Sequence, residues 1–135
     1  MSRRHSYEVS GIDHGSAPIP MAARVGPVFR SSGIMGADPG TSQLPDDPAR
    51  QVDLVFANAL ALLDVAGVEL DQVVHVEVLL ADNKYRDAVN EQWISLFPDP
   101  RDRPARHTTV RDLPGGMVVQ LCVEAFVERQ DLSGH

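Results

Sequence analysis

The 135 residues suit a single domain spanning 1–135, and the 43% of apolar residues are enough for one compact core. A formal net charge of −7 repels phosphate backbones, so the composition argues against a nucleic-acid-binding protein. The single cysteine, Cys122, can form no internal disulfide, and the sequence shows neither a signal peptide nor the roughly 20 apolar residues of a membrane span. We therefore expect a cytoplasmic protein that does not bind membranes.

The N-terminal part of the chain predicts two strands separated by a loop. Ser6 to Val9 can form a short edge strand, and the proline-containing segment His14 to Ala22 is typical of an extended loop. Val25 to Ser32 predicts a longer strand that ends at Gly33. A turn-rich stretch over 36–45 leads to the next element.

A helix over about 48–66 is the clearest element of the sequence. Asp46 or Asp47 can cap its N-terminus, Pro48 suits the first helical position, and Gly67 is a stop signal. Its apolar side chains recur with a period close to 3.6 residues. They are Val52, Val55, Phe56, Ala59, Leu62, Leu63 and Ala66.

The second half of the chain predicts three strands and one more helix. β-Branched residues over 73–80 indicate a strand, and a helix follows over about 83–97. Two further strands are expected over 107–112 and 117–127. The helix should bury Tyr85, Val89, Trp93 and Leu96. The domain core is expected to span about 18–127, with a polar tail over 129–135.

Two helices and one sheet predict a two-layer α+β domain, in which both helices pack on one face of a mixed sheet. The order strand, helix, strand predicts that 25–32 and 73–80 form a parallel pair with a right-handed crossover. The helices leave the other sheet face uncovered. An uncovered, partly apolar face predicts a homo-oligomer, although loops could cover it instead.

The side chains of two strands illustrate this two-faced pattern. On the last strand, one face carries Met117, Val119, Leu121, Val123 and Ala125, and the other carries Val118, Cys122 and Phe126 beside Gln120 and Glu124. On the middle strand, Val74, Val76, Val78 and Leu80 are expected to oppose Val73 and Leu79.

Arg106 is the first candidate for a binding residue. It enters a predicted strand directly after Pro104, which stiffens the approach, and its guanidinium matches a carboxylate with two hydrogen bonds. An ordinary surface salt bridge is the alternative. Glu124 is a candidate acid or base, although the sequence alone favours an ion pair across an interface. Cys122 is expected to be a small buried side chain rather than a nucleophile, because no group that would lower its pKa is apparent.

Other candidate positions are weaker. Asn90 lies beside the apolar stripe of the second helix, and Ser32 and Gly33 end a strand where backbone N–H groups can meet a ligand. Each can also be explained as an ordinary helix-edge or turn residue. The five histidines show no metal-ligand spacing, so no metal site is expected.

Taken in order, these signals resemble the Rid family of YjgF-like proteins, also described as endoribonuclease L-PSP-like. Ser32-Gly33, then Asp38-Pro39 and Pro45, are similar to a family series of Ser-Gly, Asn/Asp-Pro and Pro. The motifs Gln51, Asn58, Leu62 to Gly67, Val89-Asn90, Trp93 and Phe97 resemble those of its two helices. The most specific matches are Pro104-Ala105-Arg106 and Leu113-Pro114-Gly115-Gly116.

The resemblance implies a chorismate-mutase-like fold and a homotrimer, in which three sheets form a central barrel and ligands bind in clefts between subunits. Many members hydrolyse enamines or imines to 2-oxo acids and ammonia without a metal or organic cofactor. Arg106 matches the arginine that binds the substrate carboxylate. Ser32, Gly33 and Asn90 match other positions near the site.

This chain departs from the deaminase pattern on the side that handles water. Gln120 stands where deaminase members carry glutamate, and a glutamine can orient a water but cannot take its proton. Thr108 replaces a cysteine, and Ala17-Pro18-Ile19 lacks a family tyrosine. Glu124, about 7 Å further along the same strand face, is one candidate replacement. His14 and His107 are two others.

The leading interpretation is a Rid-type protein that binds a small carboxylate-bearing substrate and hydrolyses an imine or enamine, with catalytic roles for Arg106, Gln120 and Glu124. Ser32, Gly33, Asn90 and Thr108 would shape the pocket. One alternative is hydrolysis or isomerisation of another unsaturated acid in a larger pocket lined by Ile19 and Ile34. Another is a non-catalytic metabolite-binding module. Ribonuclease action, attached to some relatives, conflicts with the charge of −7.

Overall fold

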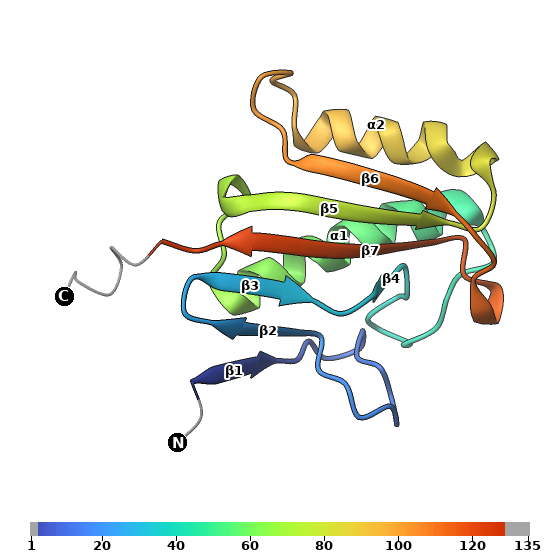
Figure 1. Cartoon of the computed structure of the whole chain (residues 1–135). Coiled ribbons are helices and arrows are strands. Elements are labelled where there is room, and N and C mark those ends of the chain that lie inside the picture. Colours follow the sequence, from blue (N-terminus) through green and yellow to red (C-terminus); the bar gives the residue numbers. More distant parts are fainter. Residues whose placement is uncertain (1–2, 129–135) are drawn as a thin grey trace.

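The computed structural model describes residues 3–128 and has two layers, a twisted sheet and two α-helices on one of its faces (Figure 1). The strands are β1 (Arg4–Tyr7), β2 (Ala22–Val25), β3 (Val28–Ser31), β4 (Ile34–Met35), β5 (Val73–Leu80), β6 (Ala105–Val110) and β7 (Val119–Phe126). The α-helices are α1 (Pro48–Ala66) and α2 (Arg86–Leu96). Short 3₁₀ turns span η1 (Leu70–Gln72), η2 (Asn83–Tyr85) and η3 (Pro114–Gly116).

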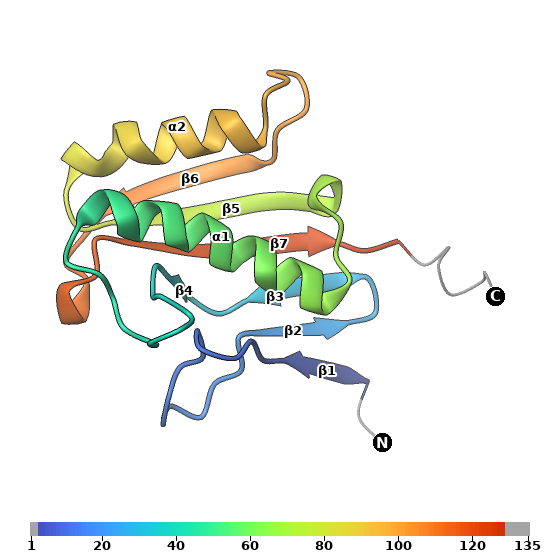
Figure 2. The ribbon, with the colours of Figure 1, turned by 180° about the vertical axis from the view of Figure 1, so that it is seen from behind.

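The strand order is β1-β2-β3-β7-β5-β6, with β4 also paired to β7. Only β5 and β6 pair in parallel, and α2 connects them, while the other pairs are antiparallel. Figure 2 shows α1 and α2 side by side on the same face of the sheet. The prediction of a two-layer α+β fold with a mixed sheet is therefore confirmed.

Helix α1 begins and ends where the sequence predicted. The Asp47 side chain accepts a hydrogen bond from the backbone N–H of Ala49, Pro48 is the first helical residue, and Gly67 closes the helix with a φ of 70°. All seven residues of the predicted apolar stripe are buried. The amphipathic pattern thus set the orientation of this helix on the sheet.

Two predictions for the strands were wrong. The expected strand over 25–32 is the hairpin β2–β3, because Gly26, with a φ of 57°, reverses the chain before Pro27. The expected parallel pairing of this segment with 73–80 does not occur, since β7 lies between β3 and β5. The C-terminal strand thus pairs with β3 on one side and β5 on the other, which local sequence patterns could not reveal.

The two faces of β7 follow the predicted alternation. Its residues Val119, Leu121, Val123 and Ala125 are buried under the helices, whereas Phe126 is 56% exposed on the other face. On β5, however, Val74 lies on the uncovered face and Val73 on the buried one. A register irregularity between Val73 and His75 reverses the expected alternation at the start of this strand.

The predicted edge strand and the predicted β6 are both shifted by about two residues. β1 begins at Arg4 rather than Ser6, and β6 begins at Ala105 rather than His107, so that Arg106 belongs to the sheet. Ile12, in the loop after β1, is 2% exposed and part of the core. The polar tail predicted over 129–135 lies outside the described residues.

Candidate functional site

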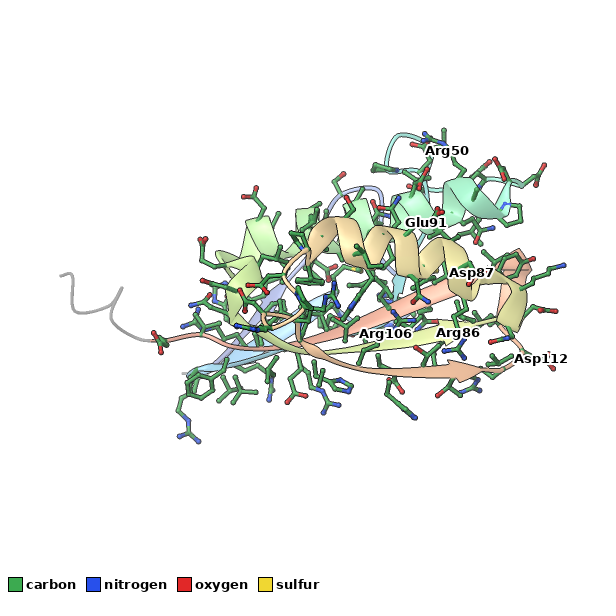
Figure 3. The ribbon with its side chains drawn as sticks, turned by 90° about the horizontal axis from the view of Figure 1, so that it is seen from above. Arg50, Arg86, Asp87, Glu91, Arg106 and Asp112 are labelled. Atoms are coloured by element: carbon green, nitrogen blue, oxygen red, sulfur yellow. The ribbon has the colours of Figure 1, made fainter. Side chains whose placement is uncertain are left out.

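Arg106 lies on the edge strand β6, on the face that the helices cover. It is in register with Val76 of β5, which is buried under α1 and α2. Its Nε donates a hydrogen bond of 2.9 Å to Oγ1 of Thr108. Its guanidinium carbon lies 5.1 Å from the centre of the Trp93 ring on α2. These two contacts hold the guanidinium between β6 and α2 (Figure 3).

Two features of its surroundings act on the charge of Arg106, its partial burial and a neighbouring arginine. Burial lowers the pKa of its guanidinium, and the positive charge of Arg86 lowers it further. An arginine nevertheless stays charged at neutral pH. Because Nε–H is donated to Thr108, the two terminal NH₂ groups are the donors left for a ligand within the described chain. They have the spacing that a carboxylate needs.

Asn90 lies in the same region as Arg106. It is half-buried on α2, three residues before Trp93, so the two side chains share one face of the helix. Because the Trp93 ring carries the Arg106 guanidinium, Asn90 lies one helical turn from the contact between α2 and β6 that holds Arg106 and Thr108. Asn90, Arg106 and Thr108 are three of the residues that the sequence selected for substrate binding.

Gln120 and Gly33 form a second group at the other side of the sheet. A β-carbon added at Gly33 would overlap with the amide of Gln120 and would lie 2.7 Å from its Cδ. The Gln120 side chain thus occupies the space that any other residue at position 33 would need. Ser32 is next to this contact, and its backbone N–H donates to the carbonyl of Met21 at 2.8 Å.

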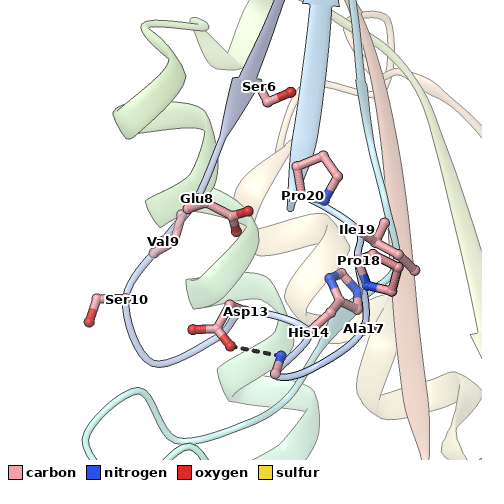
Figure 4. Close-up of a pocket in the computed structure, with 11 residues that line it drawn as sticks. Ser6, Glu8, Val9, Ser10, Asp13, His14, Ala17, Pro18, Ile19 and Pro20 are labelled. Atoms are coloured by element: carbon pink, nitrogen blue, oxygen red, sulfur yellow. Dashed lines mark hydrogen bonds between the residues drawn. The ribbon is translucent and has the colours of Figure 1, made fainter.

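His14 joins this second group. Its Nε2 lies 2.9 Å from the carbonyl oxygen of Gly33, which can only accept, so Nε2 carries the proton. Its Nδ1 is buried and has no hydrogen-bond partner in the described part of the chain. His14 also borders a wide surface pocket of about 720 Å³ formed by the loop between β1 and β2 (Figure 4). The sequence suggested His14 as a candidate replacement for the deaminase glutamate only from its place in the chain.

The two groups lie on opposite faces of the sheet. Arg106 is in register with Val76, and Gln120 is in register with Leu79 of the same strand. Residues 76 and 79 are separated by an odd number of positions, so their side chains point to opposite faces. Arg106 and Gln120 of one chain therefore cannot contact a small ligand together.

Glu124 lies on the same face as Gln120 but in a separate hollow of about 140 Å³. Arg30, His75, Glu77 and Cys122 also line this hollow. Burial raises the pKa of the Cys122 thiol, with a smaller increase from Glu77 and an opposing effect of Arg30. A raised pKa does not suit a nucleophile. His107 is exposed on the uncovered face of β6.

Ile34 does not line a pocket, contrary to the interpretation of a larger apolar site. It is fully buried in the core, while Ile19 is 47% exposed. Within residues 3–128, no group of three or more His, Cys, Asp or Glu side chains is arranged to hold a metal ion. No helix of that part of the chain is long and apolar enough to cross a membrane.

Sequence reasoning missed Arg86 and gave no structural role to Gln51 and Asn58. Gln51 and Asn58 are buried and bind the backbone of the turns around them, so their roles are structural. Arg86 is four residues before Asn90, and this i, i+4 spacing was the available signal.

Comparison with known proteins agrees with this architecture. The sequence model of the family described as Endoribonuclease L-PSP matches residues 16–127. A RutC family protein from Aquifex aeolicus is 31% identical over 115 residues, which cover 81% of this chain and 92% of that protein.

Solved structures give the same result. The crystal structure of RidA from an Antarctic Psychrobacter is similar with a TM-score of 0.82 and 27% identity, over 91% of this chain and 99% of that one. The YjgF protein of E. coli shares the fold with a TM-score of 0.80 at 21% identity, over 92% and 99% of the two chains. The chain therefore belongs to the Rid family of YjgF-like, endoribonuclease L-PSP-like proteins.

Proposed function

We propose that this protein binds a small carboxylate-bearing metabolite in clefts between the subunits of a homotrimer and hydrolyses an enamine or imine to a 2-oxo acid and ammonia. The observation that carries this proposal is the half-buried guanidinium of Arg106. It is fixed by Thr108 and Trp93, and its terminal NH₂ groups are not used within the described chain.

The opposite orientation of Arg106 and Gln120 supports a site between subunits. If both residues contact one ligand, then the second must come from another copy of the chain. β6 is an edge strand, so a neighbouring subunit can approach Arg106. On the uncovered face, Val25, Val28, Val74 and Phe126 are each at least 45% exposed, which supports burial of this face in a homotrimer.

In the proposed reaction, Arg106 binds the substrate carboxylate with two hydrogen bonds. A water adds to the carbon of the C=N bond, both of its protons are transferred to the nitrogen, and ammonia leaves as the C=O bond forms. Gln120 can accept a hydrogen bond from this water and orient it, but cannot remove its proton. Asn90 contributes an amide beside the carboxylate site. No metal or organic cofactor enters this scheme.

Gln120 favours one second candidate, a module that binds the metabolite without turnover. In either case the ligand is a small acid, the partner is another copy of this chain, and neither nucleic acid nor membrane is involved. The net charge of −7 is the reason not to extend the family's ribonuclease description to this chain. The half-buried thiol of Cys122 fits a reducing cytoplasm.

The test is the rate of 2-iminopropanoate hydrolysis, with the imine generated in situ, for the wild type, Arg106→Ala and Gln120→Glu. Catalysis predicts a clear acceleration by the wild type that Arg106→Ala removes and Gln120→Glu increases. Binding without turnover predicts no acceleration by the wild type, together with thermal stabilisation by 2-oxo acids that Arg106→Ala removes. A wild type that shows no acceleration and no thermal stabilisation would contradict both candidate functions.

A further inference from the structure

A second cation, Arg86, lies beside Arg106 at the start of α2 (Figure 3). Its Nε donates a hydrogen bond of 2.8 Å to Oδ1 of Asn83, which fixes the base of the guanidinium. Asn90 is one helical turn further along the same face, and Trp93 follows it. Arg86, Asn90 and the Arg106 guanidinium on Trp93 thus form one polar row along this face of α2.

The arrangement of the two arginines is unfavourable by itself. Each charge disfavours the other, and the lowered pKa of Arg106 reflects this repulsion in addition to burial. Arg86 also lies at the N-terminal end of α2, where the helix dipole disfavours a cation. Within the described chain, neither guanidinium has a carboxylate partner. A bound anion would relieve both effects.

The acidic residues of this region do not supply that anion. Asp87, Glu91 and Asp112 are all exposed, and none of them forms an ion pair with Arg86 or Arg106 in the part of the chain that the structure describes. A simple surface role for Arg86 would leave its position beside another half-buried arginine without a physical reason. Since one carboxylate satisfies the terminal NH₂ groups of Arg106, the charge of Arg86 is available for a second anionic group.

We propose that Arg86 is a specificity-determining residue that binds the second carboxylate of a dicarboxylate substrate, while Arg106 binds the first. This inference rests on the proposed role of Arg106 and extends it, because it names the substrate class. A short-chain 2-imino dicarboxylate would be bound along the row, with its reacting carbon near Arg106. Monocarboxylates would use only half of the available charge.

The experiment compares two stable small-molecule probes that differ only at one end of their five-carbon skeleton. 2-Oxopentanoate ends in a methyl group, and 2-oxoglutarate carries a second carboxylate at that position. Binding of both is measured by titration calorimetry for the wild type, Arg86→Gln, Arg106→Gln and Lys84→Gln. Lys84→Gln is the matched control, since it removes one exposed positive charge two residues from Arg86. Thermal unfolding verifies that each variant is folded.

The wild type is expected to bind 2-oxoglutarate about ten-fold more tightly than 2-oxopentanoate, the size of one charge-assisted contact. Arg86→Gln should remove this preference by weakening the binding of 2-oxoglutarate far more than that of 2-oxopentanoate, whereas Lys84→Gln should keep the preference. Equal binding of the two acids by the wild type, or a preference that survives Arg86→Gln, would overturn the inference.

The role of Arg106 is tested separately in the same titrations. Arg106→Gln should weaken the binding of both acids. If both acids bind this variant as they bind the wild type, the proposed function fails, whatever Arg86 does. If Arg106→Gln weakens the binding of both acids equally and Arg86→Gln changes the binding of neither, only the dicarboxylate inference fails. If the wild type binds neither acid, both the proposed function and the dicarboxylate inference fail.

Discussion

Gly33 and Gln120 are 87 positions apart in the chain, yet the Gln120 amide fills the space beside Gly33 that a β-carbon would need. The carbonyl of Gly33 also accepts a hydrogen bond from Nε2 of His14, at 2.9 Å. Three segments distant in sequence therefore meet at one point. The position of the Gln120 amide depends on the absence of a side chain at residue 33.

Replacing Gly33 with alanine should displace the Gln120 amide. The obstructing atoms are the end of a flexible side chain, so the variant should lose less than about 1 kcal/mol of stability. Imine hydrolysis, or binding of a 2-oxo acid, should fall about as much as in Gln120→Ala. The double variant should lose no more hydrolysis or binding than either single variant does.

Gly36→Ala is the matched control for this prediction. A β-carbon there would lie 2.9 Å from the backbone carbonyl carbon of Gln51, which cannot rotate away. We expect a loss of about 1–3 kcal/mol in denaturant unfolding. Additive effects of Gly33→Ala and Gln120→Ala would show that the contact does not position the amide.

Asn58 should be important for stability and not for ligand selectivity. It is 3% exposed and donates to the carbonyls of Met35 and Ala37, at 2.9 and 2.8 Å. Asn58→Ala leaves both carbonyls without these donors, so we expect a loss of about 2–4 kcal/mol in urea unfolding. Asn58→Asp should be at least as damaging because a carboxylate oxygen would face a carbonyl. A loss below about 0.5 kcal/mol in Asn58→Ala would contradict this role.

The uncovered sheet face should be buried by assembly. Val28 and Phe126 are in register on this face and are 46% and 56% exposed. Phe126→Asp would place a charge in the proposed trimer interface, so we expect smaller species in sedimentation analysis. Ile94→Asp on α2 is the control, since Ile94 is equally exposed on the helix layer. A wild type that sediments as a monomer would contradict the interface.

The thiol of Cys122 should react slowly with iodoacetamide near pH 8.5, because burial raises its pKa. Glu77→Gln removes a charge that raises this pKa and should speed alkylation, whereas Arg30→Gln should slow it. The stability linked to this group is fully present below the pKa of the unfolded thiol and is lost as pH rises through the raised folded value. Equal rates in all three proteins would contradict the assigned charges.

Local sequence patterns predicted the elements well where one residue type dictates the structure. Asp47, Pro48 and Gly67 fixed the ends of α1, and β5 occupies the predicted 73–80. The hairpin at Gly26 was missed because the apolar character continues across the turn. The position of β7 between β3 and β5 was missed because it depends on pairing between distant segments.

In the candidate site, too, local sequence predicted some features, whereas others depend on the pairing of distant segments. Asn90, Arg106 and Thr108 could be selected from the sequence, and the structure places Arg106 against Thr108 and against Trp93, one helical turn from Asn90. The orientation of Gln120 away from Arg106 follows from strand registers that no local pattern contains. The contact of His14 with Gly33 depends on a loop of irregular structure, which side-chain periodicity does not describe.

A complementation experiment tests the central claim, that Arg106 of one subunit and Gln120 of another form one site. Arg106→Ala and Gln120→Ala chains are unfolded, mixed in equal amounts and refolded, and the hydrolysis of 2-iminopropanoate is measured. Each variant alone lacks one half of every site. If two chains build each site, random assembly restores about a quarter of the wild-type activity. Activity of the mixture that does not exceed the average of the two separate variants would contradict a shared site.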